Sequence, residues 1–188
     1  MNSQPHIRDI NKPLHSSAAV FYGITALDRA VELYAINIDV DFQRGHVWTQ
    51  RQQELFVGHV LEGGEAPPLI LNEGPRGEFC KICDLIDGKQ RLTACRRWAK
   101  GEIDAELYDG TRISALHMDE IDRRICSTTI GLRFATVHLT RQESLELYLK
   151  LNRGGSIHTD QEIEHVRQLL EKEKSVIDVP VKKAKKRV

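Results

Sequence analysis

The chain has 188 residues, of which 40% are hydrophobic and 29% are charged, and its formal net charge is zero. This composition is ordinary for one soluble globular domain. No stretch approaches the roughly 18 apolar residues that a membrane-spanning helix needs, and the polar N-terminus has no hydrophobic signal core. We therefore expect a cytoplasmic protein with no membrane partner.

Positive charge is concentrated at the C-terminus. Without the last five cations the formal charge of the chain is −5, which argues against a body that binds DNA through its surface. We predict a basic disordered tail over residues 176–188, which either holds nucleic acid loosely or keeps the chain end soluble. Its candidate nucleic-acid-binding residues are Lys182, Lys183, Lys185, Lys186 and Arg187.

Hydrophobic periodicity predicts a mixed α/β domain over residues 25–175, after an irregular segment over residues 1–24. The predicted strands cover residues 36–41, 69–72, 79–86, 103–107 and 133–139. The predicted helices cover residues 25–34, 49–61, 89–100, 114–127, 140–151 and 159–170. Three helices begin with a threonine followed three residues later by Glu or Gln, the pattern of a capping box: Thr49, Thr140 and Thr159. We expect a small sheet with flanking helices.

Cys80 and Cys83 have the spacing of a metal-binding or redox pair. A tetrahedral zinc site needs four ligands, and the sequence has no second pair of Cys or His residues at ligand spacing. We therefore interpret the four cysteines, which include Cys95 and Cys126, as buried thiols.

A predicted strand, turn and helix over residues 82–100 carry the most informative residues of the chain. Asp87 and Gly88 form the turn, and Lys89 and Arg91 follow at the start of the helix. Backbone N–H groups at a helix start are unpaired and lie at the positive end of the helix dipole, so they suit an anion such as phosphate. Asp87 would repel that phosphate unless a divalent cation lies between them, or unless it only caps the helix. Both interpretations of Asp87 remain open from the residues alone.

The sequence DGKQRLT at residues 87–93 resembles the DGQQR-LT motif of a family of ParB-like domains in the ParB/sulfiredoxin superfamily. This family includes the N-terminal part of GmrSD-type modification-dependent restriction enzymes. Three further stretches resemble family segments in the same order: FQR-x-x-VW at 42–48, G-x-x-x-PP at 63–68, and LN-x-GG at 151–155 with Gln161-Glu162 after it. The chain departs from the motif at Lys89, where the family has Gln. Lysine keeps a donor for phosphate and adds charge.

The resemblance implies a nucleotide-binding helix after a sheet strand, and a role in DNA metabolism or phage defence. The expected activity is hydrolysis of a nucleoside triphosphate or nicking of DNA, with Mg²⁺ held by Asp87. The candidate catalytic residues are Asp87, Arg91, Gln43 and Arg44. The candidate phosphate-binding residues are Gly88, Lys89, Gln90, Thr93, Asn152 and Arg153. The sulfiredoxin branch would need a reactive cysteine in this turn, and the turn has none.

The expected partners are DNA, a nucleoside triphosphate and a second copy of the chain. A partner nuclease subunit is also expected, because 188 residues leave no room for the C-terminal nuclease domain of larger family members. The alternative function is a non-catalytic module that responds to nucleotide or DNA. A third is an interaction protein that has lost its pocket.

Three candidate residues also have purely structural interpretations. Arg44 would pair with Asp41 on the surface, and Trp48 would pack in the core. Asn152 and the two glycines after residue 153 would only end a helix.

Overall fold

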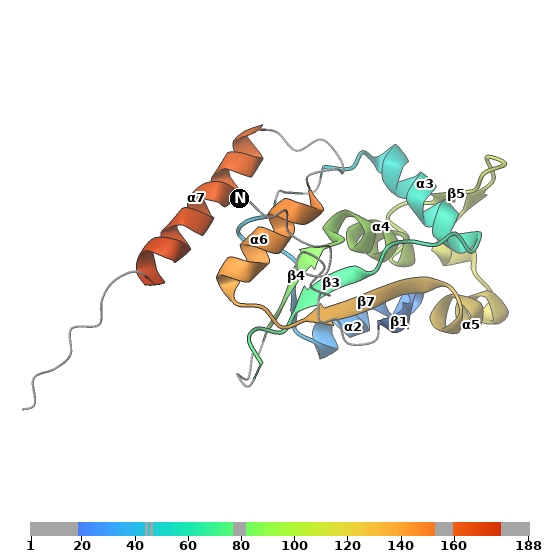
Figure 1. The fold of residues 1–188 in the computed structure, drawn as a ribbon. Helices are drawn as coiled ribbons and strands as arrows, with labels where there is room; N and C mark the ends of the chain where they lie inside the picture. Colours follow the sequence, from blue (N-terminus) through green and yellow to red (C-terminus); the bar gives the residue numbers. More distant parts are fainter. Residues whose placement is uncertain (1–18, 44, 46, 77–81, 153–159, 178–188) are drawn as a thin grey trace, which may run out of the picture.

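The computed structural model describes residues 19–43, 45, 47–76, 82–152 and 160–177. Figure 1 shows a curled sheet with helices on both faces, and the mixed α/β fold predicted from the sequence is confirmed. The strands are β1 Val20–Gly23, β2 Ile36–Asn37, β3 Leu69–Asn72, β4 Cys83–Asp87, β5 Ala105–Glu106, β6 Arg112–Ile113 and β7 Gly131–Val137. The α-helices are α2 Leu27–Leu33, α3 Gln50–Leu61, α4 Lys89–Ala99, α5 Glu120–Thr128, α6 Arg141–Leu151 and α7 Asp160–Ile177. Two 3₁₀ turns, Ile24–Ala26 and Ala115–His117, precede α2 and α5.

The main sheet has five strands in the order β1-β7-β3-β4-β2. The central strand β3 pairs in parallel with β7 and antiparallel with β4, and β4 pairs in parallel with β2. The carboxyl ends of β2 and β4 therefore lie at the same edge of the sheet. Loops that leave this edge carry Gln43 and the turn at Asp87, and this end of a sheet is where ligands commonly bind when strands are parallel.

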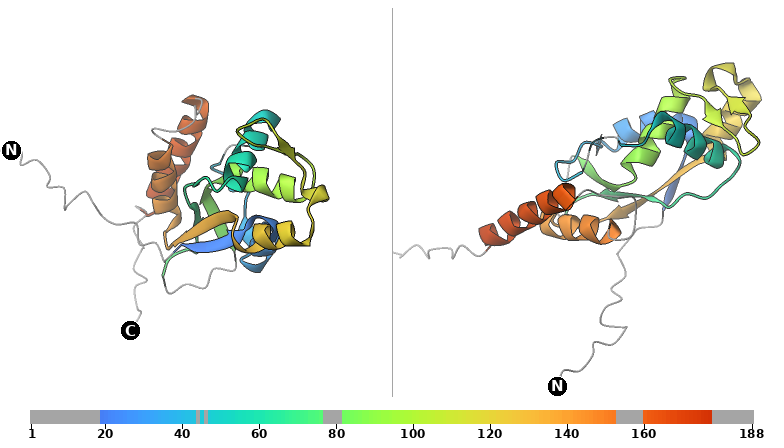
Figure 2. Two further views of the ribbon diagram at one scale, coloured as in Figure 1. Left: turned by 90° about the vertical axis from the view of Figure 1, so that its right-hand side faces the viewer. Right: turned by 90° about the horizontal axis from the view of Figure 1, so that it is seen from above.

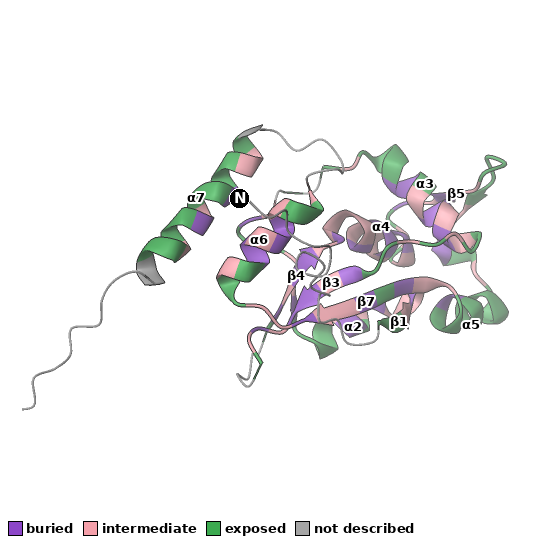
Figure 3. Ribbon diagram, in the orientation of Figure 1, coloured by how far each residue is buried: buried purple, intermediate pink, exposed green. Residues whose placement is uncertain are grey.

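Alternating side chains of the central strands divide the interior into two cores. Leu85 of β4 packs into the larger core with residues of α3 and α4, whereas its neighbour Ile86 packs into the smaller core under α6 and α7. The alternation follows from the period of two in a strand. Two views at right angles show the helices divided between the faces of the sheet (Figure 2), and β3 and β4 are largely buried between them (Figure 3). Both faces of β4 are thus fixed by packing.

The capping boxes predicted at Thr49 and Thr140 are confirmed. In each, the threonine hydroxyl accepts from the N–H three residues on, and the side chain of that residue accepts from the threonine N–H. Thr159, the third predicted cap, lies outside the described residues. Local chemistry therefore determines where α3 and α6 begin.

Several predicted boundaries are wrong. The segment 1–24 was expected to be irregular, but Val20–Gly23 form β1, which pairs with β7 at a sequence distance of more than 100 residues. The strand predicted over 36–41 ends at Asn37, after which Val40 and Phe42 turn into the smaller core. The helix predicted over 114–127 is a 3₁₀ turn followed by α5. Within the described part of the chain, no helix is long and apolar enough to cross a membrane.

Candidate functional site

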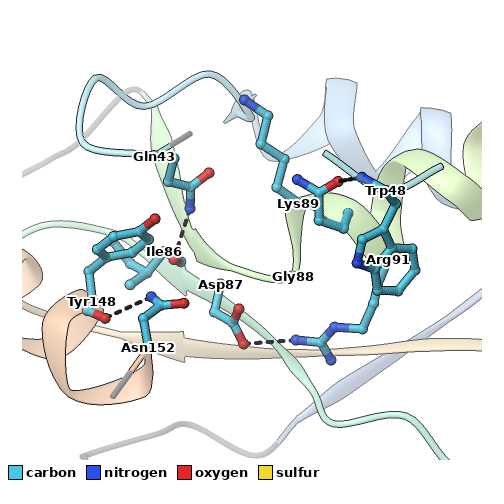
Figure 4. A pocket seen from close by; sticks show the side chains of 10 residues that line it. Gln43, Trp48, Ile86, Asp87, Gly88, Lys89, Arg91, Tyr148 and Asn152 are labelled. Atoms are coloured by element: carbon cyan, nitrogen blue, oxygen red, sulfur yellow. Dashed lines mark hydrogen bonds and ion pairs between the residues drawn. The ribbon is translucent and has the colours of Figure 1, made fainter. Parts of the chain in front are cut away.

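A pocket of about 110 Å³ lies at the carboxyl end of β4, between the first turn of α4 and the last turn of α6. Figure 4 shows residues from three separate parts of the chain around it. They are Gln43 and Trp48 after β2, Ile86 to Arg91 at the β4–α4 junction, and Tyr148 and Asn152 at the end of α6. The fold therefore brings Gln43 and Trp48 together with the DGKQR turn and Asn152.

Gly88 starts α4 in a backbone conformation that favours glycine. Its φ is +101°, and a Cβ atom built there would lie 2.0 Å from Cδ2 of the buried Leu69. Gly88 is the N-cap, and no side chain caps this helix start, so the interpretation of Asp87 as the cap is wrong. The first helical bond is donated by Leu92 N–H to the Gly88 carbonyl at 2.9 Å. The N–H groups of the first turn before Leu92 are those that a ligand anion is able to accept from.

Asp87 and Arg91 form an ion pair across the first turn of α4. The Nη2 of Arg91 donates to Oδ2 of Asp87 at 2.8 Å, and its Nη1 donates to the carbonyl of Pro67. The Arg91 side chain is 12% exposed and that of Asp87 is 38% exposed. Arg91 therefore joins the turn to the loop before β3, in addition to lining the pocket.

Lys89 has an exposed partner that sequence reasoning did not single out. Its Nζ lies 2.7 Å from Oδ1 of Asp39, and the side chains are 13% and 88% exposed respectively. An ion pair whose acid is this exposed is worth little, about 0–1 kcal/mol, because water screens it. A phosphate is able to replace Asp39 at Lys89 with little loss of stability.

Gln43 is fixed against the last residues of β4. Its Nε2 donates to the carbonyls of Leu85 and Ile86, the latter at 2.8 Å. Its Oε1 is buried and has no hydrogen-bond partner among the described residues. A buried acceptor without a donor is unfavourable by about 1–3 kcal/mol, so this atom calls for a donor from water or a ligand.

The remaining predicted residues divide into three groups. Asn152 lines the pocket and also ends α6, where its Nδ2 donates to the Tyr148 carbonyl at 2.8 Å, so its structural interpretation is correct in part. Gln90 lines the pocket with its amide directed to the loop before α3. Thr93, one turn further along α4, is not among the lining residues. Arg44, Arg153 and the basic tail lie outside the described residues.

Three lining residues were not among the predicted site residues: Trp48, Ile86 and Tyr148. Trp48 was assigned to the core; it packs edge-on against Phe56, with ring centroids 5.2 Å apart, but it also forms a wall of the pocket. Tyr148 was assigned to α6 without a role. The signal that would have found it is its position four residues before Asn152, since residues four apart lie on the same face of a helix.

One family model matches this sequence, that of the GmrSD restriction endonuclease N-terminal domain, over residues 29–186. The chain belongs to this family. The resemblance to the N-terminal domain of GmrSD-type restriction enzymes is thereby confirmed, and membership associates the chain with restriction and phage defence. No curated protein and no solved structure matches it.

In this GmrSD-type domain, Asp87 is the one carboxylate among the described residues that line the pocket. The described residues also contain no group of three or more His, Cys, Asp or Glu side chains placed to hold a metal ion. Mg²⁺ commonly binds through one or two carboxylates, with phosphate oxygens and water in its other positions. The donor set therefore fits a Mg²⁺ ion that arrives with a phosphate ligand, and not a resident metal held by protein alone.

Cysteine chemistry is absent from the described part of this pocket. Cys83, Cys95 and Cys126 are buried, as predicted, and Cys80 lies outside the described residues. Burial strongly raises the pKa of the Cys95 thiol, against a smaller opposing effect of the Arg91 charge. The Cys95 thiol, four residues after the DGKQR stretch, is therefore protonated and unreactive at neutral pH.

Proposed function

We propose that this domain binds the phosphate end of a nucleoside triphosphate at the start of α4 and hydrolyses it as part of a restriction system. The observation that carries the proposal is the uncapped α4 N-terminus, which lies at the pocket together with Lys89. Free N–H groups and a lysine supply hydrogen bonds and positive charge to the same anion.

The size of the pocket supports a phosphate group as its occupant. Pockets for whole drug-sized ligands measure roughly 300–1,000 Å³, whereas this one measures about 110 Å³. Terminal phosphate groups would occupy the pocket, and the nucleoside would lie outside it. Trp48 on the pocket wall offers an aromatic face at the rim.

Gln43 and Asp87 are the residues placed to act on the phosphate. The unpartnered Oε1 of Gln43 is an acceptor for the proton of an attacking water, which this side chain would orient. Asp87 would hold a Mg²⁺ ion that accompanies the ligand, and the metal would neutralise charge on the phosphate. Lys89 would stabilise the charge that develops on the transferred group.

The ion pair of Asp87 with Arg91 favours a second function, nucleotide binding without hydrolysis. Its carboxylate is already bound by Arg91, and no other carboxylate lines the pocket among the described residues. A domain with this arrangement would bind nucleotide without consuming it and would act as a switch for a partner nuclease. DNA and a second copy of the chain remain proposed partners in both cases.

Thermal melting with Mg²⁺ and each of ATP, GTP, CTP and UTP tests the binding step. At roughly 100 times Kd, a ligand stabilises the folded state by about 2.7 kcal/mol. For a chain of this length, that stabilisation raises Tm by roughly 5–10 °C. Lys89→Gln should weaken binding by about tenfold, because a charge-assisted hydrogen bond is lost.

Lys100→Gln is the matched control. Lys100 lies at the opposite end of α4 and pairs with Asp28 at 3.2 Å, so its loss removes the same charge without touching the pocket. An equal loss of binding in both variants, or no Tm shift with any nucleotide, would contradict the proposal. Release of inorganic phosphate then separates the two functions: turnover supports hydrolysis, and tight binding without release supports the switch.

A further inference from the structure

The side chain of Gln90 uses both ends of its amide on one loop. Its Oε1 accepts from the N–H groups of Val47 and Trp48 at 3.0 and 3.2 Å, and its Nε2 donates to the carbonyl of Gly45 at 3.1 Å. These partners lie 42 to 45 residues earlier in the chain. The side-chain amide thus pairs with backbone N–H and carbonyl groups in the way that the backbone of a neighbouring strand would.

This arrangement differs from the role expected of Gln90 as a phosphate ligand. Each described polar atom of its side chain already has a backbone partner, and the loop groups that it satisfies would otherwise lack one there. Only a primary amide offers an acceptor and a donor at this distance, because a carboxylate lacks the donor and lysine lacks the acceptor. The residue type is therefore explained by the loop alone.

The loop that Gln90 holds joins the pocket to the next helix. Trp48 forms one wall of the pocket, and Thr49 directly after it is the N-cap of α3. Gln90 is also the second residue of α4, whose N-terminus faces the pocket on the other side. One side chain therefore connects the helix start at the pocket with the loop that carries Trp48.

We infer that Gln90 is a positioning residue, which fastens Gly45, Val47 and Trp48 to the first turn of α4 and fixes the position of Trp48 at the pocket before a ligand binds. Its functional consequence rests on the proposed nucleotide binding. The fastening itself does not, since its bonds exist without a ligand. A nucleotide bound at α4 would then restrict Trp48 through Gln90 without contact between Gln90 and phosphate.

The test compares Gln90→Met with Gln142→Met. Methionine is a helix former of similar length and removes only the amide. Gln142 is the second residue of α6, as Gln90 is of α4, but its Nε2 donates within its own helix, to Glu146 Oε1 at 3.1 Å. Both variants lose a side-chain amide at the second position of a helix, but only Gln90→Met also loses the hydrogen bonds to the loop before α3.

Without ligand, the hydrogen-exchange rates of the Val47 and Trp48 backbone amides measure directly whether their hydrogen bonds to Gln90 hold the loop. Gln90→Met should speed exchange at both amides by roughly tenfold, the effect of losing one ordinary hydrogen bond. Gln142→Met should leave both rates unchanged. Unchanged rates in Gln90→Met would overturn the inference, whether or not the protein binds nucleotide.

With ligand, acrylamide quenching of tryptophan fluorescence reads the consequence. Trp98 is fully buried and donates its indole N–H to the Ile113 carbonyl, so quenching reports mainly on Trp48. With each protein saturated by nucleotide, as judged by its own melting shift, ATP, GTP, CTP or UTP with Mg²⁺ should protect Trp48 in wild type and in Gln142→Met but not in Gln90→Met. Equal protection in Gln90→Met would overturn the positioning role. The absence of any melting shift in wild type would refute the proposed function instead, and the exchange rates would still decide the fastening.

Discussion

The helices α3 and α4 begin close together but in opposite ways. At α3, Thr49 and Gln52 close a capping box, and the amide of Gln53 donates to the carbonyls of Trp48 and Thr49 at 3.1 and 3.4 Å. At α4, a glycine supplies no side-chain cap, and a pocket lies beside the first turn. The comparison teaches that the start of α3 is satisfied by its own sequence, whereas the start of α4 has no side-chain cap and lies open to the pocket.

The charges around the two helix starts differ in the same way. Near α3, Glu54 is buried, accepts from Gln50 at 2.8 Å and pairs with Arg112 at 2.9 Å. Near α4, Lys89 pairs with an acid that is 88% exposed. Removing Glu54 should therefore change stability, whereas releasing Lys89 from its acid should not. Three predictions test this contrast, in order of decreasing effect.

Gly88→Ala should have the largest effect, a loss of about 3 kcal/mol in the free energy of unfolding. The left-handed backbone costs an L-residue about 1–2 kcal/mol, and forcing a methyl group against Leu69 costs about 1–3 kcal/mol more. Gly110→Ala is the control, since Gly110 has φ +86° with nothing within 4 Å of the added atom. Urea unfolding of both variants should show a clearly smaller loss for Gly110→Ala; equal losses would mean that the contact with Leu69 contributes nothing.

Glu54→Gln should cost about 1.5 kcal/mol at pH 7, because a hydrogen bond to a charged partner is replaced by a neutral one. The hydrogen bond from Arg112 holds the pKa of the Glu54 carboxyl below its ordinary value of 4.5, against the opposing effect of burial. The folded state therefore gains stability from ionised Glu54 above pH 4.5 and loses it as the pH falls below this value. Chemical unfolding at several pH values should show the two proteins converging in acid.

Glu32→Gln, at an exposed position on α2, is the control for that experiment. It should cost little at pH 7 and should leave the acid dependence of wild type in place. A wild-type curve as flat as that of Glu54→Gln would argue against the role of the Arg112 pair.

Thr49→Ala should have the smallest effect, about 1 kcal/mol, the usual loss when an N-cap side chain is removed. Nucleotide binding should remain within a factor of about two of wild type, because the cap serves α3 and not the pocket. Thr140→Ala removes the same capping box from α6 and should cost a similar amount. A large loss of nucleotide binding in Thr49→Ala alone would show that the two helix starts are not independent.

The parts of the fold that follow from neighbouring residues were predictable. The capping boxes at Thr49 and Thr140 need only four consecutive residues, and the bounds of β3 agree with the predicted strand. Strand β1 was missed because its stability comes from pairing with Phe134 and its neighbours, far along the chain. The short β5–β6 ladder was predicted only as a single strand, since two-residue strands have no periodicity to detect.

In the candidate site, too, the features formed by neighbouring residues were predictable, and the contacts between distant residues were not. The DGKQR turn was legible because turn, helix start and cations are adjacent in sequence. The partner of Lys89 was not, because Asp39 approaches it only through the parallel pairing of β2 with β4. The role of Gln90 was also hidden, since a glutamine looks the same in a sequence whether it binds a ligand or a loop. Sequence thus indicates the groups that are adjacent along the chain, and the tertiary structure decides which distant residues meet and what each one does.

The order in which the pocket residues leave the ribosome follows from their positions in the chain. The amide of Gln43 donates to the carbonyls of Leu85 and Ile86, which are synthesised 42 and 43 residues later, so these hydrogen bonds form only after β4 has emerged. Tyr148 and Asn152, which line the α6 side of the pocket, emerge only with α6. A nascent chain that stops before α6 therefore lacks one side of the pocket, even when β2, β4 and α4 have already met. Under the proposed function, nucleotide would therefore stabilise only the finished domain and would not assist those early steps of folding.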